Sequence, residues 1–195
     1  MGRKLLAAMK VEVDNLHNDF IKEGVKKILM SCDDYNAIGP ASTSGKYHPA
    51  HDLGDGGLVR HTKTVCKILR RLMECVPNYD DHLEWDIQYS AAILHDFCKF
   101  TKEDGKLPSD TKRHSNEDHP RLMANMIREY SDDESFKKMA QRVECHMSRW
   151  NVLKYMEGPD LPLPRGMEDM MVAFADMISS AKWFQAEFDS NNNLL

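Results

Sequence analysis

Apolar residues recur at helical spacing over most of the chain, and this periodicity constrains the fold more than any other feature of the sequence. A helix that buries one face places its apolar residues three and four positions apart, whereas a half-buried strand alternates apolar and polar residues. Only the first pattern is convincing here. We expect helices over residues 5–31 (one or two helices), 58–76, 82–98, 120–130, 135–150 and 167–188. The predicted fold class is therefore all-α, a helical bundle.

The length of 195 residues suits one domain, because a chain of this size buries enough surface to form a single core. Within it we expect a helical region at 1–31, a loop at 32–58, a helical core at 59–188 and a flexible tail at 189–195. The loop is rich in Gly, Pro and small polar residues. It also contains His48 and His51, which favours a functional loop over a linker. Ser131 and Glu134 have capping-box spacing.

Charge and cysteine content argue against several classes of function. The chain has 26 Lys and Arg against 31 Asp and Glu, so general electrostatic binding to nucleic acid or an anionic membrane is not expected. Its 5 cysteines form no CxxC pair, which argues against a disulfide framework or zinc ribbon. No stretch approaches the ~20 apolar residues that cross a bilayer. We expect a cytoplasmic protein, or one in the host cytoplasm if a virus encodes it; the oligomeric state stays open.

Six histidines and aspartates fall on apolar helix faces or in apolar turns. A buried carboxylate without a partner costs several kcal/mol. A single histidine on an apolar face is usually a core residue, but a set spread over five helices is better explained by shared metal ions. Imidazole and carboxylate suit Fe, Mn, Co, Ni or Zn, and six ligands suit two such ions better than one. The candidate metal ligands are His61, His95, Asp96, His119, His146 and Asp176.

The order of these six residues, with the doublet His95-Asp96 in the string AILHDFCK, resembles the HD-domain metal-dependent phosphohydrolase superfamily. The presence of His119 and His146 resembles its dinuclear branch. GGLVRHT is similar to the start of HD domains in bacterial 3′–5′ exoribonucleases, and PASTSGKYHPAH to a loop in HD domains associated with conjugative relaxases. HMSRWN is similar to the HMGRW-type motif of small phage and bacterial HD proteins. The resemblance covers roughly residues 40–185.

The resemblance implies a role for each residue. One metal ion would be held by His61, His95, Asp96 and Asp176, and Asp96 would bridge to a second ion completed by His119 and His146. Lys99 matches the lysine of the family string HDxGK, which faces a phosphate oxygen, so Asp96 and Lys99 are the expected catalytic residues. Cys98 stands where the family has Gly, and its side chain is expected to crowd the turn that carries Lys99. Ser148 replaces the Gly of HMGRW.

The implied reaction is hydrolysis of a phosphoester by attack of a metal-bridging hydroxide on phosphorus. A small phosphorylated substrate, a nucleotide or cyclic nucleotide, is favoured over a polymer. Exonucleases of this type carry an additional oligonucleotide-binding domain, for which 195 residues leave no room. We expect Lys99, His51 and Arg149 to contact this substrate and two divalent transition-metal ions to act as cofactors. No membrane partner is expected.

Other activities stay open at this point. An HD-type diiron oxygenase resembling inositol oxygenase binds two irons with the same ligand order and consumes O₂. A 3′–5′ exonuclease or phosphodiesterase acts on nucleic-acid ends. A module that only binds a ligand is less consistent with an intact set of metal ligands. Phosphate release without O₂ uptake is the observation that favours the hydrolase.

Overall fold

The computed structural model describes residues 2–42, 45–46, 48–76, 81–102, 115–147 and 161–195. Within these residues the secondary structure is helical, and an isolated bridge joins Phe188 to Leu194. The all-α prediction is confirmed. The helices are α1 (Arg3–Ala8), α2 (Lys10–Asp14), α3 (Asp19–Ser31), α4 (Gly57–Glu74), α5 (His82–Leu94), α6 (His119–Tyr130), α7 (Glu134–Glu144) and α9 (Met167–Ser179), with short 3₁₀ helices η1 (Asp34–Ala37) and η2 (Ala50–Asp52).

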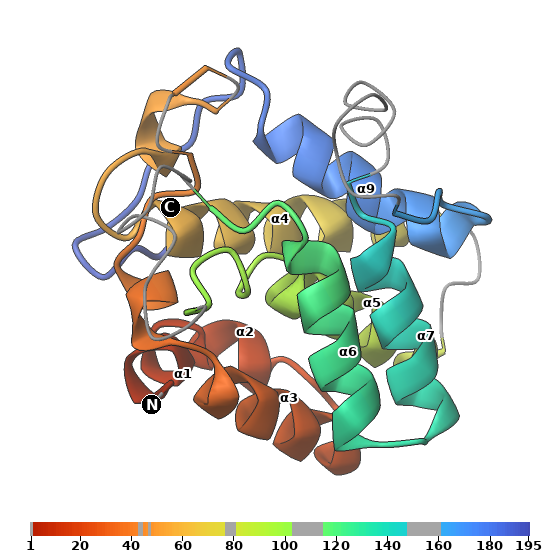
Figure 1. Ribbon diagram of the computed structural model, residues 1–195. Helices are drawn as coiled ribbons and strands as arrows, with labels where there is room; N and C mark the ends of the chain where they lie inside the picture. The colour runs from red at the N-terminus through yellow and green to blue at the C-terminus, as the bar shows by residue number, and fades with distance from the viewer. Residues whose placement is uncertain (1, 43–44, 47, 77–80, 103–114, 148–160) are drawn as a thin grey trace.

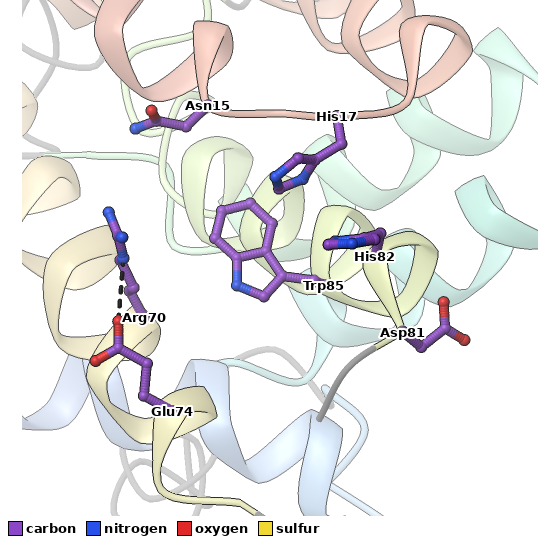
Figure 2. A pocket seen from close by; sticks show the side chains of 7 residues that line it. All are labelled: Asn15, His17, Arg70, Glu74, Asp81, His82 and Trp85. Atoms are coloured by element: carbon purple, nitrogen blue, oxygen red, sulfur yellow. Dashed lines mark hydrogen bonds and ion pairs between the residues drawn. The ribbon is translucent and has the colours of Figure 1, made fainter. Parts of the chain in front are cut away.

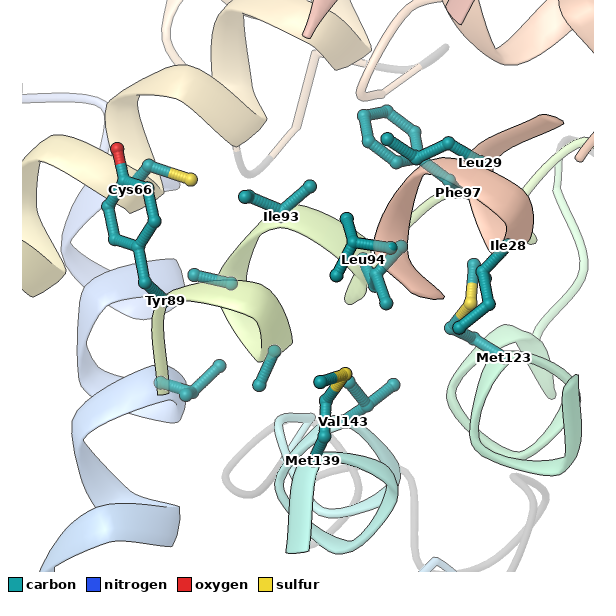
Figure 3. Packing of buried hydrophobic residues seen from close by; sticks show 14 of the residues in the cluster. Ile28, Leu29, Cys66, Tyr89, Ile93, Leu94, Phe97, Met123, Met139 and Val143 are labelled. Carbon is teal, nitrogen blue, oxygen red and sulfur yellow. The ribbon is translucent and has the colours of Figure 1, made fainter. Parts of the chain in front are cut away.

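Helix α5 lies at the centre of the fold and packs against α3, α4, α7 and α9 (Figure 1). Its residues 86–94 are all buried, most of them small or apolar, and the polar Asp86 and Gln88 are hydrogen-bonded to His17 N and to the carbonyl oxygen of Glu168. Figure 3 shows Ile93 and Leu94 of α5 surrounded by side chains of neighbouring helices, among them Leu29 of α3 and Val143 of α7. The carboxyl end of α5 is therefore fixed in the interior of the bundle.

Two helix pairs enclose this central helix. Helices α6 and α7 lie side by side as a hairpin, and α4 packs along α9 (Figure 1). The loop before α4 returns to the same region, because η2 packs on α4. Chain segments far apart in sequence thus meet around the end of α5.

Several helices are shorter than the apolar periodicity predicts. Helix α5 ends at Leu94 rather than at 98, α7 at Glu144 rather than at 150, and α9 at Ser179 rather than at 188. The N-terminal segment forms three helices instead of one or two. Periodicity reports which residues are buried, and burial continues through the turns that follow α5 and α7.

The capping box predicted for α7 is wrong. The N-cap is Asp133, whose carboxylate accepts a hydrogen bond from Ser135 N at 2.8 Å. The hydroxyl of Ser131 instead accepts from Asp133 N at 3.1 Å, so it stabilises the turn before the helix. Both residues have suitable side chains, and the one closer to the helix takes the cap.

The C-terminal residues, expected to form a flexible tail, lie against α4 in the structure. Asn192 accepts a hydrogen bond from Arg60 at 2.8 Å, and Asn193 accepts one from Lys63 at 2.9 Å. Lys67 donates to the carbonyl oxygen of Leu195 at 3.3 Å. The bond to Asn193 gives the ammonium group of the buried Lys63 a partner.

Candidate metal centre

The six predicted metal ligands lie together at the end of α5, and none is more than 5% exposed. They reach this point from five helices. Four of them sit at helix ends: His95 and Asp96 follow α5, His119 begins α6, and His146 follows α7. The remaining two, His61 and Asp176, project from within α4 and α9.

Asp96 lies at the middle of the cluster. Its Oδ1 atom is 2.9 Å from His119 Nε2 and 3.5 Å from His146 Nε2. Its Oδ2 atom is 3.4 Å from both His61 Nε2 and His95 Nε2. The cluster thus contains two triads that share this carboxylate, and in each the ligand atoms all lie within 4.8 Å of one another. We call His61, His95 and Asp96 the first triad, and Asp96, His119 and His146 the second triad.

Asp176 joins the cluster through His61. Its Oδ1 atom is 3.0 Å from His61 Nε2 and accepts a hydrogen bond from the Ser180 hydroxyl at 3.4 Å. Asp176 therefore lies beside the first triad, on the side of α9.

Three of the histidines are oriented by the same local device. The Nδ1 atom of each lies at hydrogen-bonding distance from the carbonyl oxygen three residues earlier in the chain. These distances are 2.7 Å for His95 to Ala92, 2.8 Å for His119 to Asn116 and 2.6 Å for His146 to Val143. A carbonyl oxygen only accepts, so Nδ1 carries the proton, and the Nε2 lone pair faces the cluster. Carbonyl groups at a helix end or in a turn are free to accept in this way.

His61 is held differently, because it lies inside α4. Its Nδ1 atom is 3.1 Å from the hydroxyl of Ser179 on α9 and 3.3 Å from the Oδ2 atom of Asp52 in η2. Both partners are fully buried. Neither residue could be selected from the sequence, because Ser179 lies at the end of a helix and Asp52 in an irregular segment, and polar residues are common at both kinds of position.

Several buried atoms of the cluster have no hydrogen-bond partner within the described part of the chain: Asp96 Oδ1, His119 Nε2 and His146 Nε2. His119 Nε2 and Asp96 Oδ1 are close but are not oriented as a hydrogen bond, so two lone pairs face each other. A cation between them would remove this repulsion. Imidazole nitrogen and carboxylate oxygen are ligands of Mn, Fe, Co, Ni and Zn, so the residues fit divalent transition-metal ions.

Burial and neighbouring charges act in opposite directions on these groups. Burial lowers the pKa of His119 to about 4, which leaves its ring neutral, as a metal ligand must be. Burial also disfavours the charged form of His61, but its hydrogen bonds to Asp176 and Asp52 outweigh this effect and raise the pKa to about 10. Burial opposes ionisation of Asp96 as well, yet the ammonium of Lys99 helps to hold the pKa of this carboxyl well below its usual range.

Lys99 lies beside the shared carboxylate, with Nζ 2.5 Å from Asp96 Oδ2. Cys98, expected to crowd this turn, has a buried side chain whose Sγ atom is 3.5 Å from Met126 Sδ of α6. The turn is held by Asn116, a third residue that the sequence pattern did not single out. Its amide nitrogen lies 3.2 Å from the carbonyl oxygen of Cys98 and 3.0 Å from that of Thr101.

Of the residues predicted to contact substrate, Lys99 lies at the metal centre, whereas His51 points away from it. The ring of His51 packs on Phe188 and Phe184, with centroids 5.4 and 6.4 Å away, and so lies towards the C-terminal segment. The ring of His48 is closer to the centre, 5.1 Å from the ring of His61. Arg149 lies outside the described residues, as does Ser148.

A separate cavity of about 450 Å³ lies between the end of α4, the start of α5 and the segment between α2 and α3 (Figure 2). Its walls are polar and aromatic, with Trp85 at the middle of the view. Arg70 and Glu74, bonded at 3.2 Å, form one side. Asp86 holds His17 in place at 3.0 Å. The lining residues are Asn15, His17, Arg70, Glu74, Asp81, His82 and Trp85, and none of them belongs to the metal centre.

Fold and site together define a helical protein with a buried centre of imidazole and carboxylate ligands. The family described as HD domain matches residues 58–180, which is more than half of the chain, so the chain belongs to this family. The match confirms the resemblance and places the chain in a superfamily of metal-dependent phosphohydrolases. Searches of curated proteins and of solved structures found no match. Among the described residues, no helix combines the length and apolar character that a bilayer crossing requires.

Proposed function

We propose that this protein is a dinuclear metal-dependent phosphohydrolase that cleaves a phosphoester of a nucleotide or cyclic nucleotide. The observation that supports this most strongly is the position of Asp96, whose two oxygens face two different histidine pairs. A carboxylate in this position can bridge two ions. His61, His95, Asp96 and Asp176 would hold the first ion, and Asp96, His119 and His146 the second.

Bound divalent ions would supply Lewis acidity, which lowers the pKa of water and neutralises charge on phosphoryl oxygens. Lys99 adds a positive charge beside the same carboxylate, where a phosphate oxygen would approach. The side chains of the cluster are almost completely excluded from water, which strengthens each of these electrostatic interactions. Ionised Asp96 and neutral His119 are already in the protonation states that metal ligands require.

The preference for a small substrate rests on charge. The net charge of −5 gives the surface no general attraction for a polyanion, so binding must depend on local groups. Lys99 is such a group. A mononucleotide or cyclic nucleotide offers one or a few phosphates to a local site, whereas an oligonucleotide needs an extended basic track.

The test begins with elemental analysis of the purified protein. The protein is then stripped and reloaded with Mn, Fe, Co, Ni or Zn, and each form is assayed with nucleoside phosphates, cyclic nucleotides and simple phosphodiesters. We expect two ions per chain and product formation without O₂ uptake. A mixed-valent iron signal with substrate-dependent O₂ consumption would instead identify the diiron oxygenase. Turnover confined to nucleic-acid ends would identify the exonuclease.

A further inference from the structure

Asp52 is a fully buried carboxylate that the fold brings to the edge of the metal centre from an irregular segment. Its backbone is fixed: Asp52 N donates to Pro49 O at 3.1 Å, and Asp52 O accepts from Ala41 N at 3.0 Å. The same carbonyl oxygen would lie only 2.1 Å from a side chain at Gly57. Gly57 is one helical turn before His61, so the absence of a side chain there lets η2 approach the face of α4 that carries the ligand.

One oxygen of Asp52 serves two imidazoles. Its Oδ2 atom is 3.1 Å from His48 Nδ1 and 3.3 Å from His61 Nδ1. An ionised carboxylate only accepts hydrogen bonds, so His48 Nδ1 carries a proton, and the negative charge 3.3 Å from His61 Nδ1 favours a proton on that atom over one on Nε2. The Nε2 atom of His61 is thereby directed towards the first triad.

The need for Asp52 follows from the position of His61 in its helix. The other three histidines donate Nδ1–H to a carbonyl oxygen in the last turn of a helix or just before one, but the carbonyl groups around His61 lie in the middle of the hydrogen-bond ladder of α4. An external acceptor is required. Ser179 lies at a suitable distance, but a hydroxyl both donates and accepts, so it does not by itself fix the position of the proton.

We propose that Asp52 is a positioning residue of the first metal subsite: it fixes the Nδ1–H form of His61 and increases the basicity of the ligating Nε2. A carboxylate that accepts from a ligating histidine is a common means of strengthening a metal site. The inference rests on the proposed metal centre but is independent of the reaction and the substrate. His48 lies in the same segment before α4 and contacts the same Asp52 oxygen as His61, so this segment has two contacts around one carboxylate.

The test compares Asp52→Asn with the wild-type protein. The amide keeps the size of the carboxylate but removes its charge. Dissociation constants for Zn²⁺ and Co²⁺ are measured by chelator competition, and the His61 Nδ1 proton is followed by NMR in the zinc-loaded protein. We expect binding of one of the two ions to weaken by about 10- to 100-fold. The other ion should keep its affinity, and the His61 Nδ1 proton signal should shift upfield.

Asp86→Asn is the matched control. Asp86 is equally buried and also lies 3.0 Å from a histidine Nδ1, but this histidine is His17, which lines the polar cavity and does not belong to the metal centre. This variant is expected to lose stability without losing metal affinity. Wild-type affinity for both ions in Asp52→Asn, or an equal loss in Asp86→Asn, overturns the proposal. Failure to find a hydrolysed substrate overturns the proposed function alone, because neither readout depends on turnover.

Discussion

The two triads of the metal centre are built from the same ligand types but are held in different ways. In the second triad, His119 and His146 both donate to main-chain carbonyl groups within three residues of themselves. In the first triad, His61 depends on side chains from η2 and α9. The second triad therefore depends on local chain geometry, whereas the first, through His61, also depends on the correct docking of distant segments. The predictions below test how far this difference extends to metal affinity and stability.

The largest effect is expected where the two triads meet. Asp96→Asn removes the shared charge and one anionic ligand from each subsite, so both ions should be lost and turnover should fall on the order of 10³-fold or more. Elemental analysis together with an assay of the reloaded protein measures both effects. Full metal occupancy in this variant would contradict the shared-ligand arrangement.

A smaller effect is expected at Lys99, which touches the shared carboxylate but is not a metal ligand in the proposed site. Lys99→Met should reduce turnover by about 100-fold while two ions stay bound, because a charge beside the phosphate oxygen is lost. Lys102→Met is the control, since Lys102 is half-exposed and lies 3.6 Å from Asp33. Loss of metal from the Lys99 variant would show that Lys99 holds Asp96 in position for metal binding and would contradict a role confined to the substrate.

The triads should also respond differently to pH. With a pKa of about 10, metal-free His61 is protonated at neutral pH, so an ion entering the first subsite must displace a proton. Affinity there should fall about tenfold for each unit that the pH decreases below that pKa. With a pKa of about 4, His119 is already neutral, so an ion that binds this residue displaces no proton from it until the pH approaches that value. Calorimetric titration in buffers of different ionisation enthalpy measures the protons released; equal release at both subsites would contradict this.

The smallest effect is expected at Asn116, which joins the turn after α5 to the start of α6. Asn116→Ala leaves the main-chain acceptor of His119 intact but removes the donor of two buried carbonyl groups. We expect a loss of about 1–3 kcal/mol in the free energy of unfolding and only a few-fold weaker metal binding. Denaturant unfolding is the measurement, with the exposed Asn125→Ala as control. A complete loss of the second ion would contradict this, because it would show that the Asn116 side chain is as necessary for positioning His119 as the Asn116 carbonyl oxygen.

The fold class was predictable because helical periodicity recurs over most of the chain. The six candidate ligands could be selected because polar groups such as Asp176 stand out among apolar neighbours. Asp52 and Asn116 could not be selected in this way. Both lie in irregular segments where polar side chains are the rule, and their roles depend on contacts with residues that are distant in sequence. The choice of His51 over His48 in the same loop had no basis in periodicity either.

The carbonyl acceptors behind His95, His119 and His146 have a consequence for how this protein tolerates mutation. Main-chain oxygens are present whatever amino acid is encoded, so replacing Ala92, Asn116 or Val143 leaves the acceptor in place. Side-chain identity at these positions therefore acts on packing and stability, through the buried Ala92 and Val143 and the bonds of Asn116, and not on the acceptor itself. Damage would come from changes in the length of the chain: one residue inserted between Val143 and His146 would turn the ring away from its carbonyl. Insertions and deletions in these short segments should therefore be far more harmful than substitutions at the same places.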